Sequence, residues 1–460
     1  KLMLLGKVLI NIKKKYKKIY FKDIKFNSKT CKLNDIFFAI NGNHSKGNNY
    51  IDDAINNGAK IIISNLKFEG FDKKRVLFIN HKNPRKLLSE VSSRYYKLKP
   101  KNIIAVTGTN GKTSVANFYE QILSISNKKV ASIGTLGVFS KKLKLKTNNT
   151  TLDPVSIHRI LYKLKKLKID NVILEASSHG LKQYRLNNIQ FKSGIFTNLS
   201  RDHIDYHKTF KDYFNSKLKL FNELLSYKGN MIFDNNIKES SILNKISKKK
   251  NLKKYTLGNS KSFINIRDIK QINEKKKIDF TINKKNYSIE TSLIGDIQIK
   301  NLMFAIVAAY LSGMKINNII KSIHKIKTIR GRLEKVGNLK NKARVILDYA
   351  HTPHALKTLI LNIRKEFPLS KVSLVFGCGG NRDKEKRSMM GTIARKYSNN
   401  IYLTDDNPRS ENPKLIRNQV KRGFKSKKFF EIPSRAKAIN IAIKKLNSGD
   451  VLIVAGKGHE

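Results

Sequence analysis

A run of glycine, lysine and hydroxyl residues near residue 110 has the composition of a phosphate-binding loop. The apolar segment Ile103 to Val106 leads into Thr107-Gly108-Thr109-Asn110-Gly111-Lys112-Thr113-Ser114. Glycines let backbone N–H groups curl around phosphate oxygens, Lys112 brings a positive charge to the terminal phosphates, and the Thr113 hydroxyl suits Mg2+. The sequence therefore predicts an ATP-binding loop that extends from Gly108 to Ser114.

The segment after this loop has helical periodicity. Its apolar residues are Val115, Phe118, Tyr119, Ile122 and Leu123, a spacing of three and four residues. A helix that begins at the loop directs its positive end toward the phosphates. Val106 stands where the general P-loop pattern has glycine, but the setting of strand, loop and helix still favours phosphate binding.

Two further apolar runs end in residues that can do chemistry. Val172 to Leu174 is followed by Glu175, and Gly194 to Phe196 leads into a polar segment that contains His203. An acidic residue at the carboxyl end of a strand beside a phosphate loop is well placed to bind Mg2+. We therefore predict one crevice that three strand ends supply with polar groups.

Four apolar runs in the last part of the chain also end in polar motifs. They are Val345 to Leu347 before Asp348, Val372 to Phe376 before Gly377, Ile401 to Leu403 before Thr404, and Val451 to Val454 before Gly456. Ligands of open α/β sheets bind outside the carboxyl ends of strands. Ordinary turn chemistry explains one or two such motifs, but not four together. We expect these four ends to converge on one ligand.

The charged residues of these motifs indicate what that ligand is. Arg382 and Arg409 can each hold a carboxylate through a bidentate fork, while Asp406 and Glu460 can hold an ammonium group. The expected ligand is a zwitterion.

The elements that must position these residues form an α/β protein with three domains. A chain of 460 residues is too long for one compact core. Pro100 interrupts the pattern after the first part, and strand and helix alternate from there on, before and after Arg330-Gly331-Arg332. The predicted domains are residues 1–98, residues 99–327 with a P-loop parallel sheet, and residues 328–460 with a Rossmann-like fold. Residues 235–290 are expected to add a peripheral β region with long loops.

The composition limits the partners and the compartment. The net charge is +61, yet the lysines are scattered through every segment and form no single basic stripe, so we expect no nucleic acid partner. The longest apolar stretch, Leu302 to Leu311, is shorter than the roughly 20 residues that span a membrane. The two cysteines lack metal-ligand spacing, as is typical of a cytoplasmic protein. Because residue 1 is not Met and Glu460 follows a strand-like run, further residues are expected at both ends.

These motifs together resemble the Mur ligases, from Asn27-Ser28-Lys29 to Gly456-Lys457-Gly458-His459-Glu460. The resemblance implies a bacterial, monomeric, cytoplasmic enzyme of peptidoglycan biosynthesis, with Mg2+ as cofactor. Such an enzyme uses ATP to phosphorylate the D-Glu carboxylate of UDP-MurNAc-L-Ala-D-Glu. The amine of meso-2,6-diaminopimelate then attacks the acyl phosphate, and ADP and phosphate leave. The first domain would bind the UDP substrate, the second ATP, and the third the amino acid.

The resemblance also implies roles for single residues of this sequence. Those for the UDP-muramoyl-peptide are Ser28, Thr150, Thr151, Ser177, Gln183 and Arg185. Those for ATP, beyond the loop, are Asn301, Arg332, Asp348 and His351. Those for diaminopimelate are Arg382, Asp406, Asn407, Pro408, Arg409, Gly456 and Glu460. The catalytic set is Lys112, Glu175, His203 and Lys217.

The same resemblance implies the metal ligands. They are Thr113, Glu175, His203 and Lys217, the last modified to a carbamate (N6-carboxylysine). From composition alone, Lys217 is one lysine among many on a solvated helix face.

Three alternatives remain open at this stage. A lysine-adding relative is disfavoured because lysine has no distal carboxylate for the Arg409 fork. Folylpolyglutamate synthase shares the P-loop but not Asp406-Asn407-Pro408-Arg409. A basic P-loop ATPase that depends on nucleic acid would show polynucleotide-stimulated hydrolysis and a steep dependence of binding on salt.

Overall fold

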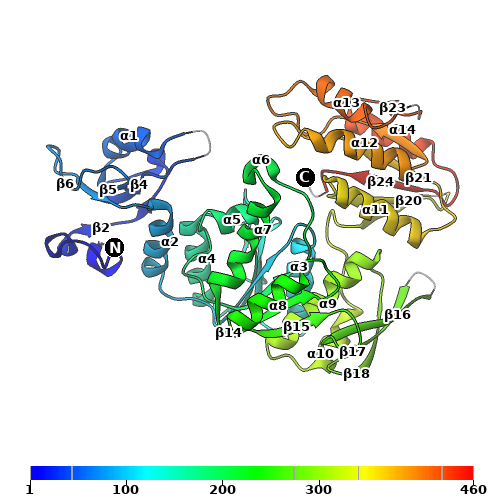
Figure 1. The fold of residues 1–460 in the computed structure, drawn as a ribbon, viewed down its shortest axis with the longest axis horizontal. Helices are drawn as coiled ribbons and strands as arrows, with labels where there is room; N and C mark the ends of the chain where they lie inside the picture. The colour runs from blue at the N-terminus through cyan, green and yellow to red at the C-terminus, as the bar shows by residue number, and fades with distance from the viewer. Residues whose placement is uncertain (1, 43–44, 273–274, 340, 426–427, 459–460) are drawn as a thin grey trace. The chain divides into compact units, whose positions relative to one another are not determined.

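The computed structural model describes residues 2–42, 45–272, 275–339, 341–425 and 428–458 (Figure 1). The chain divides into two compact units. The first comprises Lys1–Ala105, Lys129–Gly194 and Ser216–Gly229, and the second Val106–Lys128, Ile195–Asn215 and Asn230–Glu460. Within the described ranges, no helix combines the length and the apolar character needed to cross a membrane.

The elements of the first half of the chain begin with short strands and 3-10 helices. They are β1 Met3–Leu4, η1 Leu5–Lys7, η2 Lys14–Lys18, β2 Tyr20–Phe21, β3 Ile24–Lys25, η3 Ser28–Thr30, β4 Asp35–Phe38, η4 Gly47–Tyr50, α1 Ile51–Asn56, β5 Ala59–Ser64, β6 Gly70–Phe71, β7 Leu77–Asn80, α2 Pro84–Tyr95, β8 Asn102–Thr107, α3 Lys112–Ile125, β9 Val130–Gly134, β10 Gly137–Phe139, β11 Lys144–Leu145, α4 Pro154–Lys166, β12 Asn171–Glu175, α5 Ser178–Lys182, β13 Phe191–Phe196, α6 Ile204–His207, α7 Phe210–Lys219 and the π-helix η5 Leu220–Leu224.

The second half contains the longer strands and the C-terminal helices. They are β14 Leu225–Asp234, α8 Ser240–Lys249, β15 Lys253–Leu257, β16 Ile264–Ile272, β17 Lys275–Ile282, β18 Lys285–Thr291, α9 Asp296–Leu311, α10 Ile316–Ile323, β19 Glu334–Asn338, β20 Arg344–Asp348, α11 Pro353–Glu366, β21 Val372–Phe376, α12 Glu385–Tyr397, β22 Asn400–Leu403, α13 Pro413–Lys421, β23 Phe430–Glu431, α14 Arg435–Lys444 and β24 Val451–Ala455.

The N-terminal sheet has the order β3-β4-β5-β7-β6 and is buried on both faces. Side chains alternate along its strands, so Ile61 and Ile63 enter one core with α2, while Ile62 enters a second core with α1. Strands buried on both faces read as continuous apolar runs, which is why Ile61-Ile62-Ile63 lacks polar alternation.

The central sheet carries the phosphate loop. Its strand order is β11-β10-β9-β12-β8-β13-β14-β15-β16-β17-β18. The pairs β9 with β12 and β14 with β15 are parallel, whereas β16, β17 and β18 form antiparallel hairpins. These hairpins form the later part of the peripheral β region predicted for residues 235–290. The earlier part of that range instead holds α8 and the parallel strand β15. The expectation of long loops was wrong at Asn283-Lys284, a two-residue turn in which both residues have positive φ (46° and 67°).

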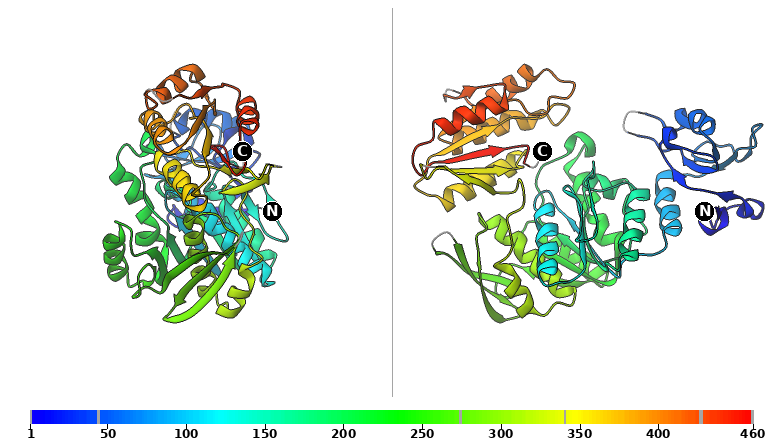
Figure 2. Two further views of the ribbon diagram at one scale, coloured as in Figure 1. Left: turned by 90° about the vertical axis from the view of Figure 1, so that its right-hand side faces the viewer. Right: turned by 180° about the vertical axis from the view of Figure 1, so that it is seen from behind.

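The C-terminal sheet has the order β19-β20-β24-β21-β22-β23, and its four central strands are parallel. Leu374 and Phe376 pack with α11, α12 and α13 on one face, while Val375 packs with α14 on the other. The sheet and its helices can be followed in Figure 2. Full burial of one such side chain stabilises the fold by roughly 1.5–3 kcal/mol. The predicted α/β class with parallel sheets is confirmed.

Candidate active site

The predicted phosphate loop connects β8 to α3. Gly111 is the residue before α3 and has φ 87°, a left-handed conformation that favours glycine. Added Cβ atoms would lie 2.5 Å from Asn301 Oδ1 at Gly111 and 1.9 Å from Thr197 Oγ1 at Gly108. Both glycines therefore let neighbouring polar side chains come against the loop backbone.

Polar contacts hold this loop in shape. Lys112 Nζ donates to the carbonyls of Gly108 and Thr109, both at 2.9 Å. Asn198, which follows β13, accepts from the backbone N–H of Thr109 (3.0 Å, through its carbonyl) and of Asn110 (3.0 Å, through Oδ1). Thr113 and Ser114 are buried at the first turn of α3. The loop has the backbone and the lysine that phosphate binding needs.

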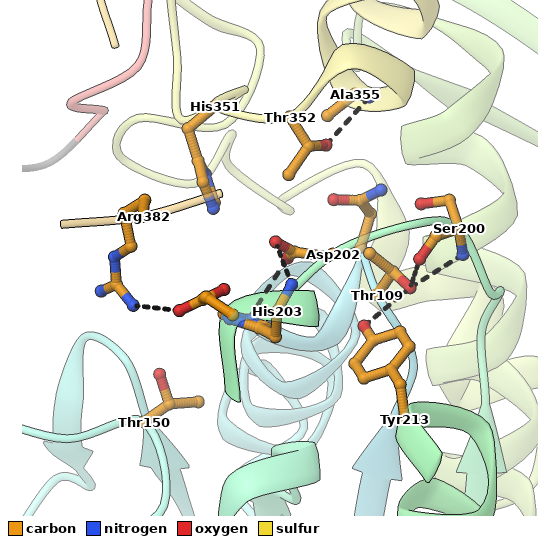
Figure 3. A network of polar contacts seen from close by, with 12 residues as sticks. Thr109, Thr150, Ser200, Asp202, His203, Tyr213, His351, Thr352, Ala355 and Arg382 are labelled. Carbon is orange, nitrogen blue, oxygen red and sulfur yellow. Dashed lines mark hydrogen bonds and ion pairs between the residues drawn. The ribbon is translucent and has the colours of Figure 1, made fainter. Parts of the chain in front are cut away.

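The Thr109 hydroxyl joins the loop to the segment after β13 (Figure 3). It lies 3.0 Å from the Tyr213 hydroxyl on α7, and it accepts from the backbone N–H of Ser200 at 2.9 Å. Burial raises the pKa of Tyr213, so this phenol stays neutral and acts as a hydrogen-bonding group. The loop and the segment after β13 are thus fixed to each other.

His203 lies beside an acidic partner. Its Nε2 is 3.2 Å from Asp202 Oδ2, and its φ of 54° is left-handed. Burial opposes the negative charge of Asp202, but the charges of His203, His351 and Lys386 outweigh burial and lower the pKa of this carboxyl. Burial lowers the pKa of His351, whose Nδ1 is 2.9 Å from the Tyr349 carbonyl. Figure 3 shows both histidines and Asp202.

Arg332 and Asp348 also adjoin the loop. One Nη of Arg332 donates to Thr113 Oγ1 at 3.3 Å, and its guanidinium lies over the Tyr349 ring, 4.5 Å from the centroid. Asp348 accepts from the backbone N–H of Leu333 and of Ala350, both at 2.8 Å. Burial raises the pKa of Asp348, and the charge of Arg332 opposes this effect. Arg332 thus links the C-terminal sheet to the predicted magnesium residue Thr113.

Asn301 lies on the inner face of α9. It is buried, and its Nδ2 donates to Gln298 Oε1 at 3.1 Å. Gln298 Nε2 in turn donates to the Arg332 carbonyl at 3.0 Å. Asn301, Arg332, Asp348 and His351, expected to contact ATP, therefore all belong to the surroundings of the phosphate loop in the second unit.

The residues expected to bind diaminopimelate lie at the carboxyl ends of β21, β22 and β24. Asn407 accepts from the backbone N–H of Gly380 at 2.9 Å, and Arg409 Nη1 donates to the Gly380 carbonyl at 2.8 Å. A Cβ on Gly456 would lie 2.9 Å from Asp406 Oδ2. Arg382 is 3.9 Å from Asp205 (Figure 3). Asp406, Asn407, Pro408, Arg409 and Gly456 thus share one edge of the sheet. Glu460 lies outside the described residues.

In the first unit, Glu175 at the end of β12 is almost fully buried, with 2% of its surface exposed. Its Oε1 accepts from the backbone N–H of Thr135 at 2.9 Å, and its Oε2 from the Thr135 hydroxyl at 3.2 Å. Thr135 Oγ1 is also 3.0 Å from Thr150 Oγ1. A Cβ on Gly134 would lie 2.1 Å from Glu175 Oε1, so only glycine leaves room for this carboxylate.

Three more of the expected substrate residues, Ser177, Gln183 and Arg185, gather around Thr151. Its hydroxyl donates to the Glu175 carbonyl (2.8 Å) and accepts from the backbone N–H of Ser177 (2.9 Å). Arg185 donates to the Thr151 carbonyl at 2.7 Å and to Gln183 Oε1 at 2.7 Å. Ser28 belongs to the N-terminal sheet region, where its carbonyl accepts from Asn57 at 3.1 Å.

Comparison with known proteins identifies the family. Residues 20–96 match the model described as Mur ligase family, catalytic domain, residues 106–309 match the Mur ligase middle domain, and residues 331–458 match the Mur ligase, glutamate ligase domain. A relative from Rickettsia montanensis, "UDP-N-acetylmuramoyl-L-alanyl-D-glutamate--2,6-diaminopimelate ligase", is 40% identical over 98% of this chain and 93% of its own length. The chain belongs to the Mur ligase family.

Further Mur ligases are similar to this chain in sequence or in fold. A relative of the same name from Rhizobium meliloti (strain 1021) is 37% identical over 94% of this chain and 88% of its own length. A solved structure of a ligase of that name has a TM-score of 0.73 and 27% identity, and covers 100% of this chain and 94% of its own. The MurF ligase from Thermotoga maritima in complex with ADP shares the fold, with a TM-score of 0.66, 18% identity, and coverage of 95% and 94%. The predicted three-domain architecture and ATP-dependent ligase class are confirmed.

The donor groups of this Mur ligase fit Mg2+ in part. The Thr113 hydroxyl and the Glu175 carboxylate offer the oxygen ligands that Mg2+ prefers. His203 offers a nitrogen, and its Nε2 lies against Asp202. Lys217 is 1% exposed on α7, so the solvated helix face read from composition was wrong. Among the described residues, no three His, Cys, Asp or Glu side chains form a ready metal cluster.

Several residues of this site were missed by the sequence reasoning. Thr135, Tyr213, Arg387 and Glu411 each contact a predicted residue or its loop. Thr135 follows β9 directly, so the strand-end argument used for Glu175 would have found it. Tyr213, Arg387 and Glu411 have no comparable signal, because they lie on or before helices among many similar residues.

Proposed function

We propose that this Mur ligase adds meso-2,6-diaminopimelate to UDP-N-acetylmuramoyl-L-alanyl-D-glutamate at the expense of ATP. The reaction forms an amide in peptidoglycan biosynthesis and releases ADP and phosphate. Relatives that cover almost the whole chain carry this activity in their names, which supports the same substrates here.

The observation that carries the proposal is the edge of the C-terminal sheet where Asp406 and Arg409 lie beside Gly456 and Gly380. An arginine and an aspartate at one edge suit the carboxylate and the ammonium group of an amino acid. Diaminopimelate has such an amino-acid group at its distal end, whereas lysine has no distal carboxylate. Arg382, Asn407, Pro408 and Glu460 are assigned to the same ligand as predictions.

The phosphate loop would perform the first chemical step. Lys112 and the N-terminus of α3 would stabilise negative charge on the γ-phosphoryl group while the D-Glu carboxylate attacks it. Thr113 and Glu175 are the residues that would hold Mg2+, which would supply positive charge to the phosphates of ATP. Asn301, Arg332, Asp348 and His351 would contact ATP. The predicted peptide-binding residues Ser28, Thr150, Thr151, Ser177, Gln183 and Arg185 would hold the muramoyl-peptide.

The second step needs a free amine and a protected intermediate. The amine of diaminopimelate attacks the acyl phosphate, the C–N bond forms, and the C–O bond to phosphate breaks. Exclusion of water would prevent hydrolysis of the acyl phosphate. We place this reaction in the bacterial cytoplasm and expect a monomer that acts on small molecules, without nucleic acid or membrane partners.

The test is phosphate release by the purified chain with ATP, Mg2+ and UDP-MurNAc-L-Ala-D-Glu. Release with meso-diaminopimelate, but not with L-lysine or without an amino acid, is the expected result. Equal release with lysine would keep the ligase class and overturn the assigned amino acid. Release stimulated by a polynucleotide instead would overturn the ligase assignment.

Lys217 is proposed to carry a carbamate that would help to hold Mg2+, as the resemblance to the Mur ligases implies. The Lys217→Ala variant is expected to lose turnover by about 100-fold or more, since removal of one charge-stabilising group costs that much. Short carboxylic acids should restore part of the activity by replacing the carbamate. Full activity of the variant, or no rescue by the acids, would contradict this role.

A further inference from the structure

A buried arginine lies behind the proposed amino-acid site. Arg387, on α12, is fully buried, and its guanidinium forms a bidentate pair with Glu411 at 2.8 and 2.9 Å. The same guanidinium donates to Gln419 Oε1 at 2.7 Å and to the Gly379 carbonyl at 3.1 Å. Arg387 therefore contacts three parts of the chain. They are α13 through Gln419, the segment before α13 through Glu411, and the loop after β21 through Gly379.

Glu411 connects the two loops that carry the predicted amino-acid residues. Its carboxylate accepts from the backbone N–H of Asn381, in the loop after β21. Its own backbone N–H donates to the Pro408 carbonyl at 3.0 Å, in the loop after β22. The hydrogen bond from Arg387 lowers the pKa of the Glu411 carboxyl most, and the backbone N–H of Asn381 lowers it further. Burial opposes this effect, but the pKa still falls to about 2, so the pair is charged at neutral pH.

The loops also touch through their backbones. A Cβ on Gly380 would lie 1.8 Å from the Pro408 carbonyl, and one on Gly377 would lie 2.4 Å from the Thr404 carbonyl. Arg409 Nη1 donates to the Gly380 carbonyl at 2.8 Å. A shift of one loop therefore shifts the other, and Arg409 with them.

We propose that the ion pair between the buried Arg387 and the partly exposed Glu411 is a positioning device for the amino-acid substrate. It rests on the proposed function: Arg387 does not touch the substrate, but fixes the backbone that carries Arg382, Asn407 and Arg409. A planar guanidinium with four acceptor contacts cannot be replaced by an ammonium group at the same geometry, because lysine presents a point charge on a flexible chain.

Two conservative substitutions test this inference. Arg387→Lys keeps the charge and loses the fork, and Glu411→Gln keeps the shape and loses the charge. Misplacement of binding groups by about 1 Å costs up to roughly 100-fold. We therefore expect the KM for meso-diaminopimelate to rise roughly tenfold or more in both variants, while the KM for ATP stays within about twofold. Loss of folded protein alone lowers apparent kcat and changes neither KM.

Arg364→Lys is the matched control. Arg364 lies on α11 and donates to the Tyr397 carbonyl (2.7 Å) and to Asn399 (2.8 Å), at the opposite end of β21 and β22. Both KM values should stay at the wild-type level in this variant.

The outcomes separate the two proposals. A wild-type enzyme that shows no diaminopimelate-dependent phosphate release would overturn the proposed function and this inference with it. An active wild type whose KM for diaminopimelate is unchanged in Arg387→Lys would overturn only the inference. If Arg387→Lys does not fold, Glu411→Gln decides in the same way.

Discussion

At the scale of single residues, Thr135 determines the orientation of Glu175. One residue supplies hydrogen bonds to both oxygens of the carboxylate, through its backbone N–H and its hydroxyl. A carboxylate held at both oxygens has little rotational freedom, so its remaining lone pairs point in fixed directions. Partners of this kind orient metal ligands in many proteins.

The substitution Thr135→Val tests that role. It removes the hydroxyl and keeps the shape, so Glu175 should rotate more freely. We expect the Mg2+ concentration for half-maximal activity to rise about tenfold, in line with the 10- to 100-fold cost of removing such a partner. Thr135→Ser retains the hydroxyl and should behave like the wild type. Direct Mn2+ binding gives a second readout, and an unchanged affinity in Thr135→Val would contradict the role of Thr135.

The sequence predicted single site residues mainly where they follow a buried strand. Glu175, Asp348 and Asp406 were found because each follows a buried apolar run. The structure places Glu175 and Asp348 at the last position of their strands and Asp406 in the loop that follows β22. Arg387 was not found, because its burial depends on α13 and on two loops that meet only in the folded chain. Lys217 on α7 reads as one lysine among 94 basic residues, and only packing shows that it is buried.

At the scale of elements, the start of α3 depends on Gly111. The Gly111→Ala substitution adds a side chain at φ 87° and brings its Cβ to 2.5 Å from Asn301 Oδ1. Left-handed backbone costs a non-glycine residue roughly 1–2 kcal/mol. The clash adds to this and displaces Asn301, so we expect ADP affinity to fall by more than about tenfold.

Gly313→Ala is the control for backbone strain. Gly313 follows α9 with the same φ of 87°, but nothing lies within 4 Å of its added Cβ. This variant should lower the melting temperature slightly and leave ADP affinity unchanged. Equal loss of affinity in both variants would show that strain, not the contact with Asn301, decides the effect.

The Arg387–Glu411 ion pair should make the stability of the fold depend on pH. The pKa of Glu411 is about 2 in the folded chain, below its ordinary value of 4.5. A lowered pKa stabilises the fold above the unfolded value, and this contribution disappears as pH falls toward the folded value. The melting temperature of the wild type should therefore exceed that of Glu411→Gln most at neutral pH. The difference should shrink between about pH 4.5 and the acid limit; a constant difference would contradict the charged pair.

Most of the strands were predictable and some turns were not. The runs Ile103 to Val106, Val372 to Phe376 and Val451 to Val454 became β8, β21 and β24 with shifts of at most one residue at either end. Buried parallel strands are apolar along their whole length, which makes them visible in a sequence. The tight turn at Asn283-Lys284 was missed because Lys284 is unusual in a left-handed conformation.

At the scale of the whole molecule, the charge of +61 should act on the substrates unequally. A positive field raises the local concentration of anions and has little effect on a zwitterion. We expect the KM for the UDP substrate to rise severalfold between about 0.05 M and about 0.3 M salt, because screening shortens the range of the field. The KM for diaminopimelate serves as the internal control and should change much less. Equal changes would argue against a general electrostatic effect.

The division into three α/β domains was predictable, because each part has its own rhythm of strands and helices. The alternation of strands and helices did not show which residues from distant parts of the sequence come together for the reaction. The contact of Arg332 with Thr113, for example, joins residues 219 positions apart. The predicted domain boundaries at residues 98 and 327 remain predictions.

The backbone contacts at Gly377 and Gly380 bear on how such an enzyme can evolve. Neither position admits a side chain without moving the neighbouring loop, so the backbone around the proposed amino-acid site resists mutation. The side chains of Asn407 and Arg409 can be substituted while the backbone of these loops stays in place. A new amino-acid preference can therefore arise through a few substitutions on an inherited scaffold, without a new fold around the site.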